Sequence, residues 1–313
     1  MILALAGGVG GAKLADGLTQ ILPPENLTIV VNTGDDFEHL GLSISPDLDT
    51  VMYTLAGLNN VEQGWGLAGE TWSFMAATKR LGGETWFNLG DQDVATHVER
   101  TRRLRGGEAL SSVTADLCCK LGIRHRVVPM SDDRVRTMVE TDEGMLTFQD
   151  YFVRLACKPV LKRLEFAGAD SARPASAFLD ALRSPATEAI VICPSNPFLS
   201  VLPILSLPGI RQALAERKAP LVAVSPIVGG QAVKGPAAKI MRELEMEVSP
   251  AAVAAFYGDL LDGLVIDNAD EGLAETWHGP ALHVTDTIMR DRQDKARLAA
   301  ETLRFAAGLK AHA

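Results

Sequence analysis

The chain has 313 residues, of which 47% are hydrophobic and 22% charged, a balance typical of globular proteins that excludes a disordered or collagen-like chain. Its formal net charge of −9 argues against nucleic-acid binding, which usually requires a basic surface. No segment approaches the ~18 consecutive apolar residues of a membrane span, and the apolar run at the N-terminus is too short for a secretory signal. We therefore expect a cytoplasmic protein that binds neither nucleic acid nor membrane.

The first 57 residues predict two successive strand–loop–helix units. Residues 2–6 and 27–31 are short apolar runs of the kind that form buried parallel strands. Each run ends in a loop of turn-forming residues, and apolar residues at helical spacing follow each loop. This alternation is typical of a doubly wound α/β sheet.

Residues 60–185 break this rhythm. The apolar spacing predicts helices followed by two β-rich stretches, and we interpret the segment as an inserted, largely helical subdomain that covers the carboxyl edge of the sheet. Its densest basic run, residues 99–105, is interpreted as the solvated face of a helix, with an anion site as the alternative. The expected helices span 69–81, 92–104 and 110–121, and the expected strands span 126–128 and 135–139.

From residue 188 the α/β alternation returns. We expect a Rossmann-like, doubly wound and mostly parallel sheet whose nucleotide-binding core comprises residues 1–59 and 186–313. The strands predicted in its second part span 189–193, 221–224, 264–266 and 282–284, and residues 296–309 form a closing helix.

A glycine-rich loop follows the first strand. Glycines let the backbone approach a phosphate closely, and the next helix offers its N-terminal amides to an anion. The loop matches neither the P-loop pattern nor a strict GxGxxG, and a tight turn without a ligand is the alternative. We favour phosphate or nucleotide binding by Gly7, Gly8, Gly10, Gly11 and Lys13.

Two later loops also follow apolar strands. Because ligands of parallel sheets bind at the carboxyl ends of the strands, these loops are expected to complete the nucleotide site. The residues concerned are Ser195, Asn196, Pro226 and Gly229.

Two acidic loops lie in the second β–α unit. Asp35 and Asp36 follow the second strand, and Asp47 and Asp49 lie where a helix begins at Pro46. The latter pair could simply cap that helix. A diphosphate ligand, however, usually needs a divalent cation, and Mg²⁺ is bound through one or two carboxylates and phosphate oxygens. Asp36 and Asp49 are candidates for a general base.

Trp86 and Phe87 precede Asn88 and a glycine turn. They could pack in a core or form one wall for a flat aromatic ligand. If they lie in a strand, they point to opposite sides and one of them reaches the ligand. His97 is expected to make a structural hydrogen bond, since no nucleophile pattern accompanies it.

Several segments together resemble the 2-phospho-L-lactate transferase family of coenzyme F420 biosynthesis, over essentially the whole chain. The most specific of them are PDLDTVMYTL and SPIVGGQAVKGPA. The others include GGVGGAKLADGL, WFNLGDQDVATHVERTRRLRGG, PMSDDRVRT, FQDYFVR and PSNPFLSVLPILSLPGIR.

The resemblance implies Mg²⁺-dependent transfer of a phospholactyl-type group from a guanosine diphosphate ester to the deazaflavin Fo, with release of GMP, by a Rossmann-like homodimer. It implies that Asp35 and Asp49 hold the metal and carry catalysis, and that Asp49 and Asn88 contact Fo. Asn88 stands where archaeal members often have lysine. The three-carbon acid of the donor, whether lactate, enolpyruvate or glycerate, stays open.

Two other functions are compatible with a glycine loop after a first strand. An NAD(P)-dependent oxidoreductase is disfavoured because Asn32, and no acidic residue, ends the second strand. A regulatory nucleotide-sugar-binding protein of the gluconeogenesis-factor type resembles this chain in the glycine loop, but is not expected to have the PDLDTVMY and WFNLGD segments.

Overall fold

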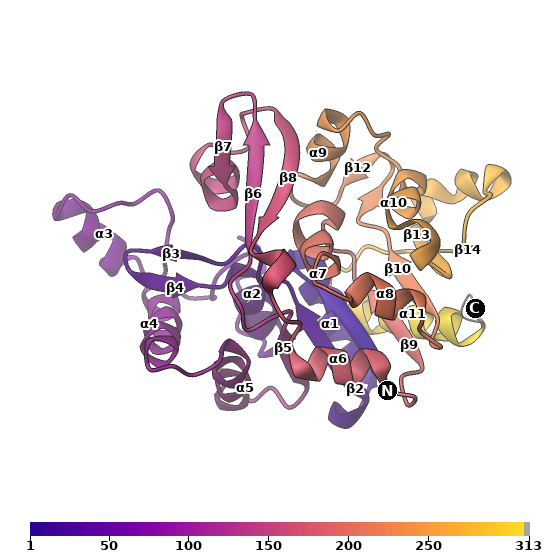
Figure 1. The fold of residues 1–313 in the computed structure, drawn as a ribbon, viewed down its shortest axis with the longest axis horizontal. Helices are drawn as coiled ribbons and strands as arrows, with labels where there is room; N and C mark the ends of the chain where they lie inside the picture. Colours follow the sequence, from indigo (N-terminus) through magenta and orange to yellow (C-terminus); the bar gives the residue numbers. More distant parts are fainter. Residues whose placement is uncertain (310–313) are drawn as a thin grey trace.

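The computed structural model describes residues 1–309 and contains a seven-stranded parallel sheet flanked by helices (Figure 1). This confirms the predicted α/β class. The strand order is β14–β13–β10–β9–β1–β2–β5. The strands are β1 (Ile2–Ala6), β2 (Leu27–Val31), β5 (Arg126–Pro129), β9 (Ala189–Ile192), β10 (Leu221–Val224), β13 (Gly263–Asp267) and β14 (Ala281–Thr285).

The order of the strands reverses at the middle of the sheet. The chain passes from β1 outward to β2 and β5, and returns to the other side of β1 with β9, so that Leu5 is paired with both Val30 and Ile192. All five residues of β1 and of β2 are buried. Such a reversal opens a crevice beyond the carboxyl ends of the two central strands, where ligands of this architecture bind.

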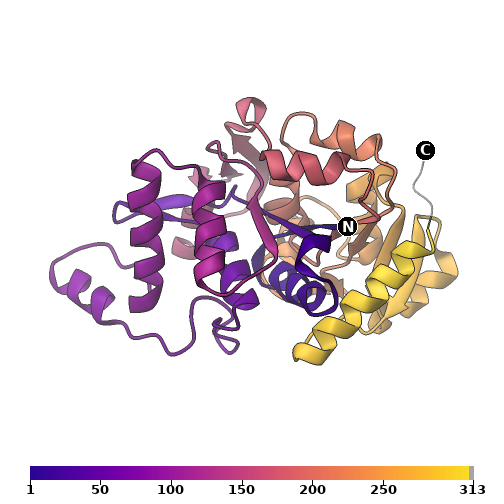
Figure 2. The same ribbon diagram turned by 90° about the horizontal axis from the view of Figure 1, so that it is seen from below.

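Helices cover both faces of the sheet. Alternate residues of β1 point to opposite faces, so Ala4 packs under one helical layer and Leu5 under the other. Figure 2 shows α1 and α11 side by side in the first layer. That layer contains α1 (Gly8–Ile21), α2 (Pro46–Leu55), α5 (Leu110–Lys120) and α11 (Arg292–Ala307), and the other contains α6 (Ser176–Arg183), α7 (Leu202–Leu205), α8 (Ile210–Ala215), α9 (Ala237–Glu243) and α10 (Pro250–Tyr257).

Residues 60–185 differ from the expected helical insertion. They supply β5, which is an edge strand of the central sheet, as well as helix α6 on one of its faces. They also form a three-stranded antiparallel sheet of β7 (Gly144–Thr147), β6 (Arg136–Thr141) and β8 (Leu161–Ala167). The boundaries at residues 59 and 185 therefore do not separate the sheet from the rest of the chain.

Smaller elements complete the fold. The hairpin of β3 (Phe37–His39) and β4 (Leu42–Ile44) packs against α4 (Asp91–Arg105), and α3 (Ser73–Arg80) lies beyond it (Figure 1). No helix within residues 1–309 combines the length and apolar character needed to cross a membrane. The remaining elements are the hairpin of β11 (Ile227–Val228) and β12 (Gln231–Ala232), and short 3-10 or π-helical segments at Pro24–Asn26, Asp150–Arg154, Ala169–Ser171, Pro197–Val201, Gly258–Leu260 and Asn268–Thr276.

Candidate functional site

The glycine loop joins β1 to the N-terminus of α1 and contacts two other loops. The Gly7 amide donates to Ser195 Oγ at 3.0 Å, and the Gly8 amide donates to Asp47 Oδ1 at 2.7 Å. The Asp47 carboxylate therefore occupies part of the anion-binding position at the start of α1.

Close packing of the loops explains two of the glycines. A Cβ at Gly10 would lie 2.2 Å from the Pro194 carbonyl oxygen, and one at Gly11 would lie 2.4 Å from Ser195 Oγ. No side chain fits at either position without moving backbone or a buried hydroxyl. Gly10 and Gly11 are thus needed for the close contact between the β1 and β9 loops, and nucleotide binding by the loop stays a prediction.

Lys13 points from α1 toward the loop that follows β14. Its Nζ donates to the Met289 carbonyl oxygen at 2.9 Å. Burial lowers the pKa of Lys13, and the nearby cations Lys295 and Lys234 lower it further. Of these two lysines, Lys295 pairs with Asp16 of α1 at 3.0 Å.

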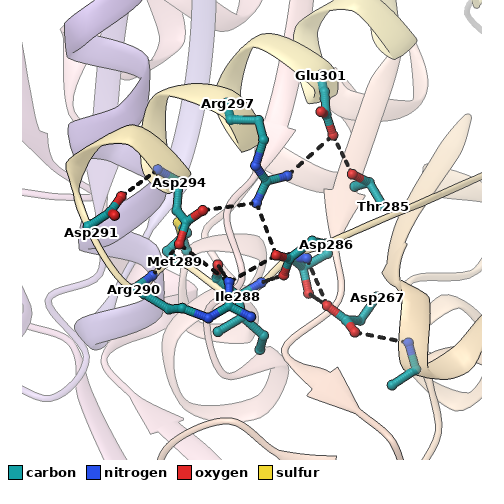
Figure 3. Close-up of polar contacts among 12 residues, drawn as sticks. Asp267, Thr285, Asp286, Ile288, Met289, Arg290, Asp291, Asp294, Arg297 and Glu301 are labelled. Carbon is teal, nitrogen blue, oxygen red and sulfur yellow. Dashed lines mark hydrogen bonds and ion pairs between the residues drawn. The ribbon is translucent and has the colours of Figure 1, made fainter.

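Figure 3 shows how the loop after β14 is held. At the end of β13, Asp267 Oδ2 accepts from the Thr287 amide at 2.8 Å and from the Thr287 hydroxyl at 2.9 Å. Alternating charges then tie the loop to α11. They run through Asp286, Arg290, Asp294, Arg297 and Glu301, with contacts of 2.9 to 3.7 Å.

The other predicted nucleotide-binding residues lie at the carboxyl edge of β9 and β10. Asn196 Oδ1 accepts from the amides of Phe198 and Leu199, while its buried Nδ2 has no partner in the described chain. Pro226 is half-buried, and the exposed Gly229 donates its amide to Asp270 Oδ2 at 3.0 Å. The Asn196 amide is therefore a free donor at this edge.

Asp35 and Asp47 form a buried carboxylate pair around Asn32. Asn32 Nδ2 donates to Asp47 Oδ2 at 2.9 Å, and Asn32 Oδ1 accepts from the Gly34 amide at 2.8 Å. Burial raises the pKa of Asp35 well above its usual value, and the charge of Asp47 raises it further. Burial also raises the pKa of Asp47. Two buried carboxylates without a nearby counter-charge fit a divalent cation, which would supply that charge.

Asp36 lies next to this pair. Ser45 Oγ donates to Asp36 Oδ2 at 2.7 Å, whereas the buried Oδ1 has no partner within residues 1–309. Burial raises the pKa of Asp36 to about 7, although the Arg136 guanidinium opposes the shift. A carboxyl with a free oxygen and a pKa near neutrality is suited to accept a proton from a substrate.

Asp49 forms an ion pair and close contacts with side chains of α4. Both of its carboxylate oxygens accept from Arg100, and His97 Nδ1 lies 3.7 Å from Oδ2. His97 also contacts Asp93 at 3.2 Å, whose other oxygen accepts from Tyr53 at 2.6 Å. Asp49, Asp93 and His97 are close enough to share a metal ion, but the Arg100 fork already binds the Asp49 carboxylate.

The position of Arg100 shows that the interpretation of residues 99–105 as a solvated helix face is wrong for this residue. The run 99–105 was expected to be a solvated helix face, yet Arg100 is only 1% exposed and is one of the largest fully buried side chains. Its neighbour Arg102 is exposed, as expected. The metal pair implied by the resemblance, Asp35 with Asp49, stays a prediction, and Asp47 is the carboxylate that interacts most with Asp35.

A cavity of about 720 Å³ opens between the β3–β4 hairpin and the β6–β8 sheet. Acidic, basic and aromatic side chains all contribute to its lining. It is lined by Gly34, Asp35, Asp36, Phe37, Glu38, Trp86, Arg134, Arg136, Thr137, Met138, Thr147, Phe148, Gln149, Asp150, Ala167 and Gly168.

Trp86 and Phe87 lie in a bend, so the strand alternation expected for them is wrong. Both rings pack against the hairpin: Phe87 contacts Phe37 edge-on with ring centroids 4.8 Å apart, and Trp86 contacts His39 at 5.1 Å. Only Trp86 lines the cavity, while Phe87 packs with a small apolar cluster around Ile44, Met75 and Leu89. Asn88 is exposed and is not one of the residues lining the cavity.

Several cavity residues carried no role in the sequence-based prediction. Arg136 and Thr137 come from PMSDDRVRT, and Phe148 and Gln149 come from FQDYFVR. Both segments were recognised only as part of the family resemblance. Their position became clear only from the fold, because the β6–β8 sheet brings them to Asp35 across about a hundred residues of sequence.

Comparisons with known proteins show the family to which the chain belongs. The family model described as 2-phospho-L-lactate transferase CofD matches residues 2–303. A phosphoenolpyruvate transferase of Kitasatospora aureofaciens is 44% identical, covering 97% of each chain, and a 2-phospho-L-lactate transferase of Methanosarcina mazei is 39% identical, covering 95% of this chain and 98% of the relative. A UPF0052-family crystal structure from Bacillus halodurans shares the fold, with a TM-score of 0.63 at 18% identity over 96% of this chain and 98% of that one. The chain therefore belongs to the 2-phospho-L-lactate transferase CofD family of transferases.

Proposed function

We propose that the protein transfers a phosphorylated three-carbon acid from a guanosine diphosphate ester to the ribityl hydroxyl of Fo in coenzyme F420 biosynthesis, releasing GMP. Family membership supports the reaction class. The observation that carries the proposal is the cavity, because it joins aromatic surfaces to the acidic loop at the carboxyl edge of the sheet. A planar acceptor and a charged reacting centre would meet there.

The planar ring system of Fo suits the outer part of the cavity. Trp86 and Phe37 form one wall, and Phe148 with Met138 lies on the β6–β7 side. Stacking on an aromatic side chain stabilises a flat ligand by about 0.5–1.5 kcal/mol beyond the burial of its area. The ribityl chain would then extend toward Asp35 and Asp36.

Asp35, which lines the cavity, and Asp47, which accepts a hydrogen bond from Asn32, would hold Mg²⁺, and the raised pKa of both carboxyls supports this assignment. The cation would neutralise the negative charge that develops on the diphosphate of the donor. The resemblance implies Asp49 as the second ligand; we favour Asp47, because Arg100 already binds both oxygens of Asp49. Asp47→Asn would then weaken Mg²⁺ binding more than Asp49→Asn.

Asp36 is our candidate for the group that accepts the proton of the attacking hydroxyl. Its Oδ1 is free and Ser45 holds Oδ2, so the carboxyl keeps a fixed orientation. Asp36 also lines the cavity. Asp49, the other candidate base, already accepts hydrogen bonds from Arg100 at both oxygens.

The guanosine diphosphate part of the donor is proposed to lie across the sheet edge. The free amides at the start of α1, the Asn196 amide and the Lys13 ammonium are the donors available there. Pro226 and Gly229 are expected to complete this site from the loop that follows β10. The contact between Asn88 and Fo stays a prediction, because Asn88 is not one of the residues that line the cavity.

Turnover measurements test the proposal. Wild-type protein with Mg²⁺, Fo and a GDP-linked three-carbon acid should release GMP, and omission of Fo should stop the release. Asp35→Ala should abolish turnover and keep the fold. Nicotinamide binding without GDP binding would instead favour an oxidoreductase, and donor binding without turnover would favour a regulatory nucleotide-sugar-binding protein.

A homodimer and a cytoplasmic location are further parts of the proposal that follow from the family resemblance. Light scattering at micromolar concentration tests the oligomeric state directly. A mass of twice the 33.5 kDa chain is expected, and a monomer at all concentrations would contradict it.

A further inference from the structure

Two arginines, Arg134 and Arg136, line the cavity and have no role in the reaction described so far. We propose that Arg136 binds the carboxylate of the three-carbon acid carried by the donor, an inference that rests on the proposed function. It makes Arg136 a specificity-determining residue for an α-carboxylate next to the transferred phosphate.

The backbone around Arg136 is fixed to the acidic loop. The amide of the next residue, Thr137, donates to the Gly34 carbonyl oxygen at 2.7 Å. Gln149 Nε2 donates to the Asp35 carbonyl oxygen at 3.1 Å, from a position beyond β7. The antiparallel sheet therefore holds Arg136 beside the residues proposed to bind the cation and the reacting hydroxyl.

Most donors of the Arg136 guanidinium are free. Its one hydrogen bond within residues 1–309 runs from Nη1 to the Val135 carbonyl oxygen at 2.7 Å, and its buried Nε has no partner. Asp36 is the carboxylate that interacts most strongly with its charge, yet the two groups form no ion pair in the described chain. A guanidinium with a free planar fork is the preferred partner of a carboxylate.

A cation is needed in the cavity to offset the repulsion between its acidic lining and the carboxylate of the donor. Four carboxylates line it, namely Asp35, Asp36, Glu38 and Asp150. Lactate, enolpyruvate and glycerate each carry a carboxylate close to the ester oxygen. The acidic side chains of the cavity would repel this carboxylate. The other buried arginine nearby, Arg100, is bound to Asp49. Arg136 is half-buried, whereas Arg134 in the same lining is exposed.

A double-mutant-type cycle, in which Arg136 and the donor carboxylate are removed separately and together, tests this pairing. Wild type and Arg136→Gln are assayed with the GDP-linked lactyl donor and with its carboxamide analogue. In wild type, loss of the donor carboxylate should lower kcat/KM about 10- to 100-fold, as expected for a charge-assisted hydrogen bond. In Arg136→Gln both donors should react at a similar, low rate, because the pairing is already lost.

Further measurements separate the pairing from other roles of Arg136. Arg136→Lys should recover part of the discrimination, and the Kd for GDP, which has no carboxylate, should stay unchanged in both variants. Arg163→Gln is the matched control, since Arg163 lies exposed on β8 of the same sheet and pairs with Glu140 and Glu165.

Two results would overturn the inference while wild-type turnover still supports the proposed function. One is a carboxylate effect of equal size in wild type and Arg136→Gln. The other is a rise in the KM for Fo in Arg136→Gln with no change for the donor, which would assign Arg136 to the acceptor. Absence of wild-type turnover with every donor would instead overturn the proposed function, and this inference with it.

Discussion

At the scale of single residues, the site is defined by buried charges and by the groups that compensate them. Arg100 on α4 binds Asp49 on α2, and His97 and Asp93 extend the contact to Tyr53. The Asp35 and Asp47 carboxylates have no cation of this kind beside them within residues 1–309. The same short segment therefore carries one carboxylate paired with an arginine and two without such a partner, which we propose as the metal ligands.

Removal of Arg100 should be strongly destabilising. Arg100→Gln leaves the buried Asp49 carboxylate without its counter-charge, which typically costs about 3–5 kcal/mol. Arg102→Gln is the control: Arg102 pairs with Glu99 at the surface, so this substitution should leave the free energy of unfolding nearly unchanged. Urea unfolding measures both values. Equal effects of the two substitutions would show that the Arg100 pair has no special role.

Asp36 should make stability depend on pH when Mg²⁺ is absent. Its pKa is about 7 in the folded chain and near 3.8 in the unfolded chain. Between these values only the folded chain keeps the proton, so the free energy of unfolding falls as pH rises from about 4 to 7 and levels off above the folded pKa. The difference from Asp36→Asn should reach at most about 4 kcal/mol. Identical pH profiles of wild type and variant would refute the burial of an ionisable group here.

Trp86 and Phe87 should differ in function. Trp86→Ala removes a ring that lines the cavity and should raise the KM for Fo about 3- to 15-fold without changing donor binding. Phe87→Ala should mainly lower stability, by about 1–3 kcal/mol, since the ring is half-buried. Steady-state kinetics and thermal unfolding separate the two. If both substitutions changed the KM for Fo and the KM for the donor equally, the segment would have a structural role and would not bind Fo.

At the scale of elements, the close contact between the β1 and β9 loops positions the start of α1. The helix begins at Gly8, and its first turn packs against Pro194 and Ser195. The amides proposed to bind phosphate depend on this packing. A side chain in the turn would therefore move both loops.

Gly10→Ala tests that contact. Its Cβ would lie 2.2 Å from the Pro194 carbonyl oxygen, so backbone must shift, and we expect a loss of about 1–3 kcal/mol together with weaker GDP binding. Gly272→Ala is the control, because a Cβ there meets nothing within 4 Å. Thermal unfolding with and without GDP gives the comparison. A Gly10→Ala protein as stable as the control would mean that the loops are not packed as described.

The sequence predicted those elements whose signal is local. Apolar runs and turn formers located the strands of the central sheet, and helical spacing located α4 and α5 within one or two residues. The β3–β4 hairpin was missed because its turn places Leu40 at a φ of 51°, a conformation that leucine rarely adopts and that no sequence rule predicts.

The site was predicted only in part, for a physical reason. Asp35 and Asp47 were recognised as acidic loop residues, but the contact of Gly8 with Asp47 spans 39 residues and that of Arg100 with Asp49 spans 51. Such pairings depend on which helices and strands become neighbours. Arg136 likewise reaches the cavity only because β6 joins the loop after β2.

At the scale of the whole molecule, the strand reversal at β1 and β9 gathers loops from both halves of the chain. Ligands that bridge these loops should stabilise the fold as a unit. GDP at about 100 times its Kd should add about 2.7 kcal/mol in the presence of Mg²⁺. Asp35→Asn should reduce the part that depends on Mg²⁺. An unchanged melting curve at millimolar GDP and Mg²⁺ would contradict nucleotide binding.

The central claim is the transfer of a phosphorylated three-carbon acid to Fo. The most direct measurement is mass spectrometry of the deazaflavin after incubation with Mg²⁺ and each GDP-linked donor in turn. The account predicts a product with the mass of Fo plus the phosphorylated acid less one water, formed by wild type and absent with Asp35→Ala. Recovery of unmodified Fo from wild type with every donor would contradict it.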